Sequence, residues 1–169
     1  MIKIVFRCSA CLVLMLLMGL PAVARSQSAA RPTLVVETLD GKVFNLANER
    51  GKWVIVNFWA TWCSPCLAEM PAISEYVATH KNVTAIGLDY QPESLATVVE
   101  FVRKHPVDYP LAKIDYVKPL PGLAMPKGLP ETDLIAPDGH LAKHFVGPIN
   151  AKLLDAAIAE AKSHADSGH

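Results

Sequence analysis

Apolar residues along this chain of 169 residues change their period several times, and each period predicts a different element. Residues 53–59 are almost continuously apolar, as in a strand buried on both faces of a parallel sheet. Residues 67–80 show helical spacing, and we expect Pro71 to interrupt and kink that helix. Residues 83–88 predict another strand, and residues 93–104 an amphipathic helix. The expected apolar side of that helix is Leu95, Val98, Val99 and Val102. Together these elements indicate a right-handed parallel crossover.

Two hairpins flank this unit. The first joins strand-like residues 33–38 to residues 42–46 through an Asp-Gly pair. The second joins residues 132–136 to residues 141–146, again through an Asp-Gly pair. The pattern therefore predicts strands on both sides of the central apolar run.

The remaining segments are a long loop and a final helix. Residues 105–130 carry six prolines and two glycines, which predicts a loop with a short strand near residues 109–112. Asn150 is a suitable cap for a helix over residues 151–163, and residues 164–169 are expected to form a flexible tail.

The first 24 residues have the composition of a secretory signal. Lys3 and Arg7 precede an apolar stretch at residues 8–20, and an Ala-x-Ala cleavage site ends at Ala24. The apolar stretch is short for a span of about 20 residues, but with the residues that follow it an uncleaved anchor remains an alternative. We therefore expect export to the periplasm, with the protein either released or anchored.

Removal of the signal changes the charge and the cysteine count. Residues 25–32 then form a tether and residues 33–163 a single domain. Sixteen basic and sixteen acidic residues balance in the whole chain, and loss of the two basic residues of the signal leaves a net charge of −2. Nothing in this composition suggests nucleic acid. Cys63 and Cys66 become the only two cysteines, in a compartment that favours thiol oxidation.

Residues 62–66 read Trp-Cys-Ser-Pro-Cys, directly after the predicted buried strand and at the start of a helix. A thiolate at a helix N-terminus is stabilised by unpaired N–H groups and the helix dipole, so Cys63 is the expected nucleophile, exposed at the helix start. Cys66, one turn further on and shielded by the helix, is the expected resolving thiol. Ser64 and Pro65, between the cysteines, are expected to tune the redox potential. Zinc normally takes four ligands, so no metal site is expected.

Four sequence pieces make the chain similar to the thioredoxin superfamily. They are Asn57-Phe58-Trp59-Ala60-Thr61-Trp62-Cys63-Ser64-Pro65-Cys66, Glu69 with Pro71, Gly128-Leu129-Pro130-Glu131-Thr132, and Val146-Gly147. Within the superfamily the chain resembles the secreted thiol reductases of the TlpA/ResA type and the cytochrome c maturation reductases. This resemblance implies an α/β thioredoxin-like fold, with a central mixed β-sheet flanked by helices and an N-terminal β-hairpin extension.

The resemblance also implies roles for substrate-binding residues. Pro130 would be a cis-proline facing the cysteines, and the backbone of Leu129 would pair with an incoming peptide. Trp62 would lie beside Cys63, with Trp59 in the core. Glu131 would contribute to the active-site surface, although a solvated loop acid is an equal alternative.

Proton transfer is the next requirement of the site. Ordinary thioredoxins bury an acid at the position of Asn57, and asparagine cannot titrate. The TlpA-like branch resembles this chain in having an acid three residues after the second cysteine. Glu69 lies one helical turn from Cys66, and burial would raise its pKa so that it exchanges protons with that thiol. The alternative is a solvated glutamate that only favours the helix dipole. Asp133 departs from the family pattern and needs partners or solvent.

The leading hypothesis is a periplasmic thiol-disulfide oxidoreductase that reduces disulfides of chosen partner proteins, such as apocytochrome c or copper-site assembly factors. The sequence has no nicotinamide or flavin motif, so no cofactor is expected and the electrons must come from a separate thiol donor, by resemblance a membrane reductase. One alternative is a disulfide-forming oxidase. Another is a Cu(I) carrier using both cysteines and a histidine, although His140, His144 and the terminal histidines are not at a helix spacing that points to Cys63.

Overall fold

The computed structural model describes residues 31–167. The predicted signal at residues 1–24 and most of the predicted tether at residues 25–32 lie outside the described residues. Among the helices that are described, none combines the length and the apolar character needed to cross a membrane.

A five-stranded mixed sheet forms the centre of the structure, with the order β5-β4-β3-β6-β7. The central strand β3 (Trp53–Trp59) pairs in parallel with β4 (Val83–Asp89) and antiparallel with β6 (Glu131–Ile135). β5 (Leu111–Lys113) extends the parallel side, and β7 (Leu141–Val146) extends the antiparallel side. The predicted parallel crossover and the second hairpin are confirmed.

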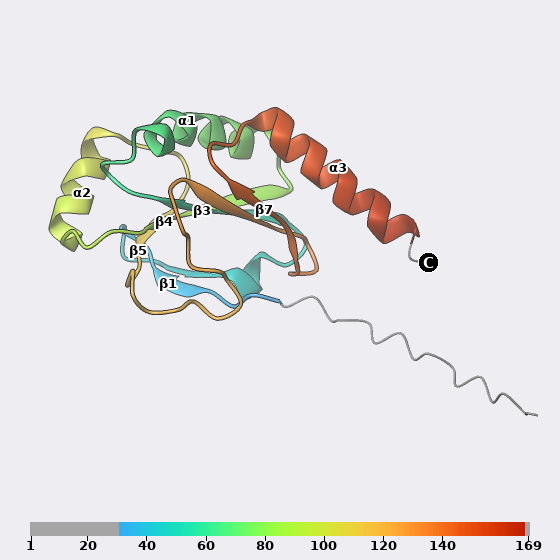
Figure 1. Cartoon of the computed structure of the whole chain (residues 1–169), viewed down its shortest axis with the longest axis horizontal. Helices are drawn as coiled ribbons and strands as arrows, with labels where there is room; N and C mark the ends of the chain where they lie inside the picture. Colours follow the sequence, from blue (N-terminus) through green and yellow to red (C-terminus); the bar gives the residue numbers. More distant parts are fainter. Residues whose placement is uncertain (1–30, 168–169) are drawn as a thin grey trace, which may run out of the picture.

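The first hairpin is also confirmed, as a separate two-stranded sheet of β1 (Val35–Glu37) and β2 (Val43–Asn45). A short 3-10 helix, η1 (Leu46–Glu49), follows it. The hairpin reaches the main sheet at its β5 edge, where the Leu39 N–H donates to Leu111 O at 2.7 Å. It lies on the face of the sheet opposite α1 (Ser64–Thr79) and α3 (Ala151–Ser167) (Figure 1).

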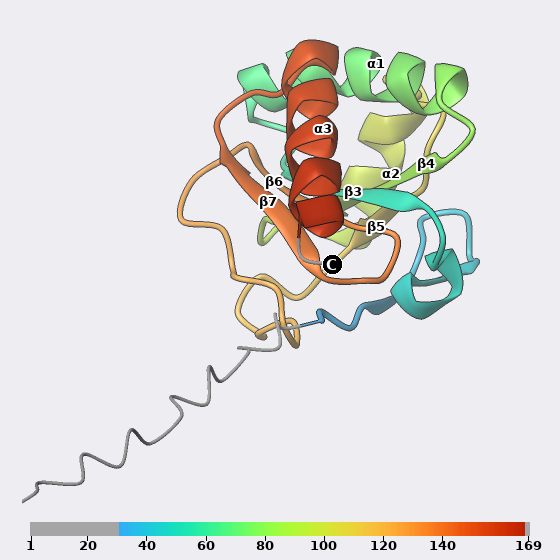
Figure 2. The ribbon, with the colours of Figure 1, turned by 90° about the vertical axis from the view of Figure 1, so that its right-hand side faces the viewer.

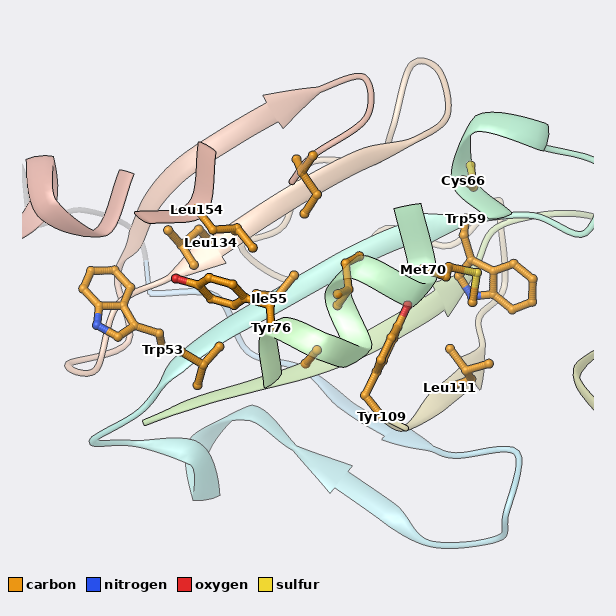
Figure 3. Packing of buried hydrophobic residues seen from close by; sticks show 14 of the residues in the cluster. Trp53, Ile55, Trp59, Cys66, Met70, Tyr76, Tyr109, Leu111, Leu134 and Leu154 are labelled. Carbon is orange, nitrogen blue, oxygen red and sulfur yellow. The ribbon is translucent and has the colours of Figure 1, made fainter. Parts of the chain in front are cut away.

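Burial on both faces explains the continuous apolar character of β3. Trp53, Ile55 and Trp59 belong to the core cluster that the helices cover, whereas Val54 and Phe58 belong to the cluster under the hairpin. Figure 3 shows the helix-side cluster, in which Cys66, Met70 and Trp59 lie at one end. α2 (Leu95–Lys104) joins the same cluster through its one buried residue, Val98. The cysteine pair is therefore anchored at one end of a packed core.

Three details of the helices differ from the sequence predictions. The expected apolar side of α2 is wrong in part, because Leu95 and Val99 are 55% and 41% exposed, whereas Val98 and Val102 contact the core as predicted and Phe101 joins them. Helix α1 continues through Pro71 without a break in its helical assignment, so the predicted interruption is wrong. Helix α3 extends to Ser167 and includes much of the predicted tail. Figure 2 shows α3 in front of the sheet, with α1 behind its upper end.

Candidate active site

Cys63 and Cys66 form a disulfide at the start of α1, which is thus the oxidised form of the pair. Cys63 is the N-cap residue of the helix, and its Sγ accepts a hydrogen bond of 3.3 Å from the Cys66 N–H. Ser64 and Pro65 occupy the exposed first turn, where proline needs no N–H partner. In the reduced enzyme the same backbone N–H group and the helix dipole favour a thiolate at Cys63.

Burial of the two cysteines is more complete than expected. Cys66 has no exposed surface, as predicted, but Cys63 is only 3% exposed, so its predicted exposure is wrong for the oxidised form. The disulfide holds Cys63 at the edge of the same core cluster as Cys66, which accounts for its burial. Trp62 is the exposed neighbour, with 63% of its surface accessible, whereas Trp59 is fully buried in the core as predicted. The Trp62 indole is therefore accessible beside a recessed disulfide.

The side chains of Asn57 and Glu69 meet beneath the cysteine helix. Asn57 Nδ2 donates to Glu69 Oε1 at 2.8 Å, and the Ile149 backbone N–H donates to Glu69 Oε2 at 2.7 Å. Glu69 is buried, so the alternative of a solvated glutamate is wrong. Burial raises the pKa of Glu69, and the hydrogen bonds from Ile149 and Asn57 partly oppose that rise. The carboxyl is thus poised to hold a proton one turn along α1 from Cys66.

The loop before β6 carries the peptide-binding candidates. The Leu129-Pro130 bond is cis, as the resemblance implied, and Leu129 is half-buried while Pro130 is buried. Glu131 is buried rather than solvated, which overturns the solvated-acid alternative. Its Oε1 accepts hydrogen bonds from the backbone N–H groups of Lys127 and Gly128, at 2.9 and 3.1 Å. Glu131 therefore fastens the loop that leads to the cis-proline.

Asp133 finds its partner on the neighbouring strand. His144 Nδ1 lies 2.7 Å from Asp133 Oδ1, and His144 Nε2 lies 3.3 Å from Glu131 Oε2. Asp133 is buried, and this burial raises its pKa, while the hydrogen bond to His144 acts in the opposite direction. One imidazole thus joins the two acids of β6, one of which fastens the cis-proline loop. His144 is a residue that the sequence reasoning did not connect to Asp133, although the predicted hairpin, extended through its turn, pairs these two positions.

Two histidines considered for the Cu(I) alternative, His140 and His144, have other partners. His144 lies between the two acids of β6, and His140 Nδ1 lies 2.5 Å from Asp138 Oδ1 in the turn that joins β6 to β7. Over residues 31–167, no group of three or more histidine, cysteine or acidic side chains is arranged to hold a metal ion. The described part of the chain offers no observation that favours the Cu(I) alternative.

A further buried polar group supports the segment before Cys63. Gln91 Oε1 accepts hydrogen bonds from the Thr61 N–H and hydroxyl, and Gln91 Nε2 donates to Asp89 Oδ1. The sequence reasoning missed these residues. Only the polar character of Asp89 at the end of an otherwise apolar strand could have drawn attention to them.

Comparison with known proteins supplies the family. A family profile described as AhpC/TSA matches residues 28–116, more than half of the chain. The chain belongs to the AhpC/TSA family. Thiol-disulfide oxidoreductase ResA of Bacillus cereus is 36% identical to this AhpC/TSA member over 118 residues, which are 69% of this chain and 67% of that protein. The ResA protein of Bacillus subtilis is 29% identical over 133 residues, 76% of this chain and 72% of its own length.

Solved structures agree with this family assignment. A putative thiol:disulfide interchange protein DsbE from Chlorobium tepidum superposes with a TM-score of 0.68 at 25% identity, covering 79% of this chain and 95% of that protein. The thioredoxin-like fold of this AhpC/TSA member is therefore established, as are the mixed sheet and the N-terminal hairpin. The chain is a thiol-disulfide oxidoreductase, and Cys63 and Cys66 supply the Cys-x-x-Cys pair that this chemistry needs.

Proposed function

We propose that this oxidoreductase works in the periplasm as a reductant of selected partner proteins. The observation that carries the proposal is the buried Glu69 carboxyl, bound to Asn57 and located one helical turn after Cys66. A reductase must generate a thiolate at its buried second cysteine in every cycle. Because its pKa is raised by burial, Glu69 is suited to accept that proton near neutral pH.

The reaction starts from the reduced enzyme. The Cys63 thiolate attacks one sulfur of a partner disulfide, forms a mixed disulfide and expels the other partner sulfur as a thiolate. Glu69 accepts the proton of Cys66, and the Cys66 thiolate then attacks the Cys63 sulfur. This second exchange closes the Cys63–Cys66 disulfide and releases the second partner thiolate. Two electrons pass to the partner, and a separate dithiol donor must return them to the enzyme.

Several features support a protein partner. Trp62 presents an exposed aromatic surface beside the disulfide, and the cis-proline loop is fastened by Glu131. Tryptophan is frequent among residues that dominate binding energy in protein interfaces. The partner's peptide would pair with the Leu129 backbone while its disulfide reaches Cys63. Apocytochrome c and copper-site assembly factors are the proposed partner classes, with a membrane reductase as electron donor, and both proposals rest on the family resemblance.

The proposed compartment follows from the predicted secretory signal in residues 1–24, whose removal would leave one cysteine pair in the mature chain. A periplasmic reductase needs recharging, because that compartment tends to oxidise thiols. The proposed membrane donor would return the two electrons to the enzyme.

A trapping experiment tests the proposal. In cells that require the protein, Cys66→Ser should accumulate mixed disulfides through Cys63 with one or a few partners, because the resolving sulfur is absent. The Cys63→Ser, Cys66→Ser double variant is the control and should trap nothing. Absence of any trapped species would contradict the mechanism. Equilibration with glutathione tests the direction, since a potential nearer to about −120 mV than to about −270 mV would indicate an oxidase instead.

A further inference from the structure

A chain of polar groups runs from the edge of the sheet to the segment that carries Cys63. Lys113 Nζ, in β5, lies 3.3 Å from Asp89 Oδ2 at the end of β4. Asp89 Oδ1 accepts a hydrogen bond of 2.6 Å from Gln91 Nε2. Gln91 Oε1 in turn accepts from the backbone N–H and the hydroxyl of Thr61, at 3.3 and 3.1 Å. The chain of contacts therefore ends two residues before Cys63.

Burial prevents these polar groups from exchanging their partners for water. The side chains of Asp89 and Gln91 are almost completely buried, and none of their nitrogen or oxygen atoms lacks a partner. Lys113 also donates to the Gln91 backbone oxygen at 2.8 Å, so one ammonium group holds both neighbours. An unpaired amide or carboxylate at such a depth would cost substantial free energy, so each member of the network restricts the positions of the others.

The turn at Thr61 and Trp62 lies between two buried residues, Ala60 and Cys63. Trp62, the residue after Thr61, is largely exposed and thus gains little from packing. The backbone N–H of Cys63 donates to Ala60 O at 3.1 Å, which closes a turn around Thr61 and Trp62. The two hydrogen bonds from Thr61 to Gln91 are side-chain contacts that fasten this turn to the segment directly after β4.

We propose that Asp89 is a positioning residue of the active site. It holds Gln91, Gln91 holds Thr61, and the turn so fixed presents Trp62 and Cys63 to the partner. This role deepens the proposed function, on which it rests for the protein nature of the partner. The holding of Trp62 is independent of the direction of electron transfer.

The charge of Asp89 makes the positioning of the Thr61–Trp62 turn sensitive to pH. Burial raises the pKa of Asp89 to about 6, Lys113 on β5 opposes the rise, and Glu93 ahead of α2 adds to it. These are the charged groups that act on Asp89 within the described residues. A protonated carboxyl attracts the Lys113 ammonium less and is a weaker acceptor for Gln91. The turn should therefore be held less firmly below about pH 6 than above it.

Trp62 itself provides the test. Trp53 and Trp59 are buried, so acrylamide should quench mainly Trp62, and Trp62→Phe in each background identifies its signal. In the oxidised wild type, Trp62 anisotropy should rise through a step near pH 6. Gln91→Ala should lower the anisotropy and remove the step. Asp89→Asn, which like the protonated carboxyl lacks the charge that attracts Lys113, should hold the anisotropy at the low-pH value and also remove the step.

Activity gives a second readout. For the reduced enzyme acting on insulin disulfides, Gln91→Ala should lower kcat/KM about tenfold through KM, as expected for the loss of one buried hydrogen bond. Its reaction with the small disulfide dithiobis(nitrobenzoate), which needs no docked peptide, should change little. Asp108→Ala removes an exposed acid outside the network and serves as the control.

The outcomes separate the two proposals. If folded Gln91→Ala leaves Trp62 anisotropy unchanged, or if the pH step survives in Asp89→Asn, the positioning role is wrong. A wild-type enzyme that fails to reduce insulin contradicts the proposed reduction of protein partners, but Trp62 anisotropy still decides the positioning role.

Discussion

Asp133 and His144 face each other across β6 and β7, with Oδ1 and Nδ1 2.7 Å apart. The same imidazole reaches Glu131 with its other nitrogen, at 3.3 Å. Two acids that are almost inaccessible to solvent are thus joined through one exposed histidine. The partner on the adjacent strand satisfies one oxygen of Asp133, whereas its buried Oδ2 has no hydrogen-bond partner among the described residues.

Removal of this histidine should destabilise the protein. His144→Ala leaves two buried carboxylates without their shared partner, and because the histidine itself is exposed, the expected cost is that of unsatisfied buried acceptors, about 1 to 3 kcal/mol. Urea unfolding measures the effect. His140→Ala, in the exposed turn, is the matched control, and an equal effect of the two substitutions would contradict this prediction.

Glu69→Gln should slow the second exchange step and spare the first. Reduced enzyme and dithiobis(nitrobenzoate) release one thiol when Cys63 attacks and another when Cys66 resolves the mixed disulfide. Loss of the proton acceptor should slow the second release about 100-fold. Stopped-flow absorbance separates the phases, and Glu75→Gln on the exposed side of α1 is the control. Equal slowing of both phases would exclude a specific role for Glu69 in resolution.

The same substitution should change how stability depends on pH. The folded pKa of Glu69 is raised, so as pH rises the unfolded chain releases this proton before the folded chain does. The free energy of unfolding of the wild type should therefore fall between the unfolded and the folded pKa of Glu69, and Glu69→Gln should lack that part of the decline. Denaturant unfolding of both proteins across this range provides the comparison. Parallel curves would show that Glu69 is not a buried titrating group.

Asn57→Asp should restore the acid of ordinary thioredoxins at a cost. A carboxylate at the Asn57 position would lie against Glu69, whose Oε1 is 2.8 Å from Asn57 Nδ2. Two buried carboxylates at such a short distance cannot both ionise readily, so one of them retains a proton. The free energy of unfolding therefore falls as pH rises. The variant should lose more stability near pH 8 than near pH 5. Asn82→Asp, at an exposed position, is the control and should show no such trend.

The two tryptophans near the cysteines should respond differently to truncation. Trp62→Ala should leave the melting temperature nearly unchanged, since the indole is largely exposed, but lower kcat/KM for a protein disulfide about tenfold. Trp59→Ala should cost about 3 to 5 kcal/mol of stability, because it opens a cavity in the core. Calorimetry and a reduction assay distinguish these effects. A large loss of stability in Trp62→Ala would contradict its assignment as a partner-facing residue.

The sequence by itself determined the fold class and the redox pair. Continuous apolar character predicts β3 because both faces of that strand are buried. The helical spacing that begins after the cysteines places Cys63 at the start of α1. The cis bond before Pro130 followed from family resemblance. These features are local or recurrent, so residue order is enough to reveal them.

Only the tertiary structure decided which polar groups meet. Glu69 is bound by Asn57 and by the Ile149 N–H, 80 residues away in the chain. His144 joins the acids of β6, and Gln91 holds Thr61 across 30 residues. Hydrogen bonds act over about 3 Å, so such pairs form only once packing has brought distant segments together. Packing also turned Leu95 outward and covered Cys63, because the sum of contacts, not the local pattern, determines which side of an element is buried.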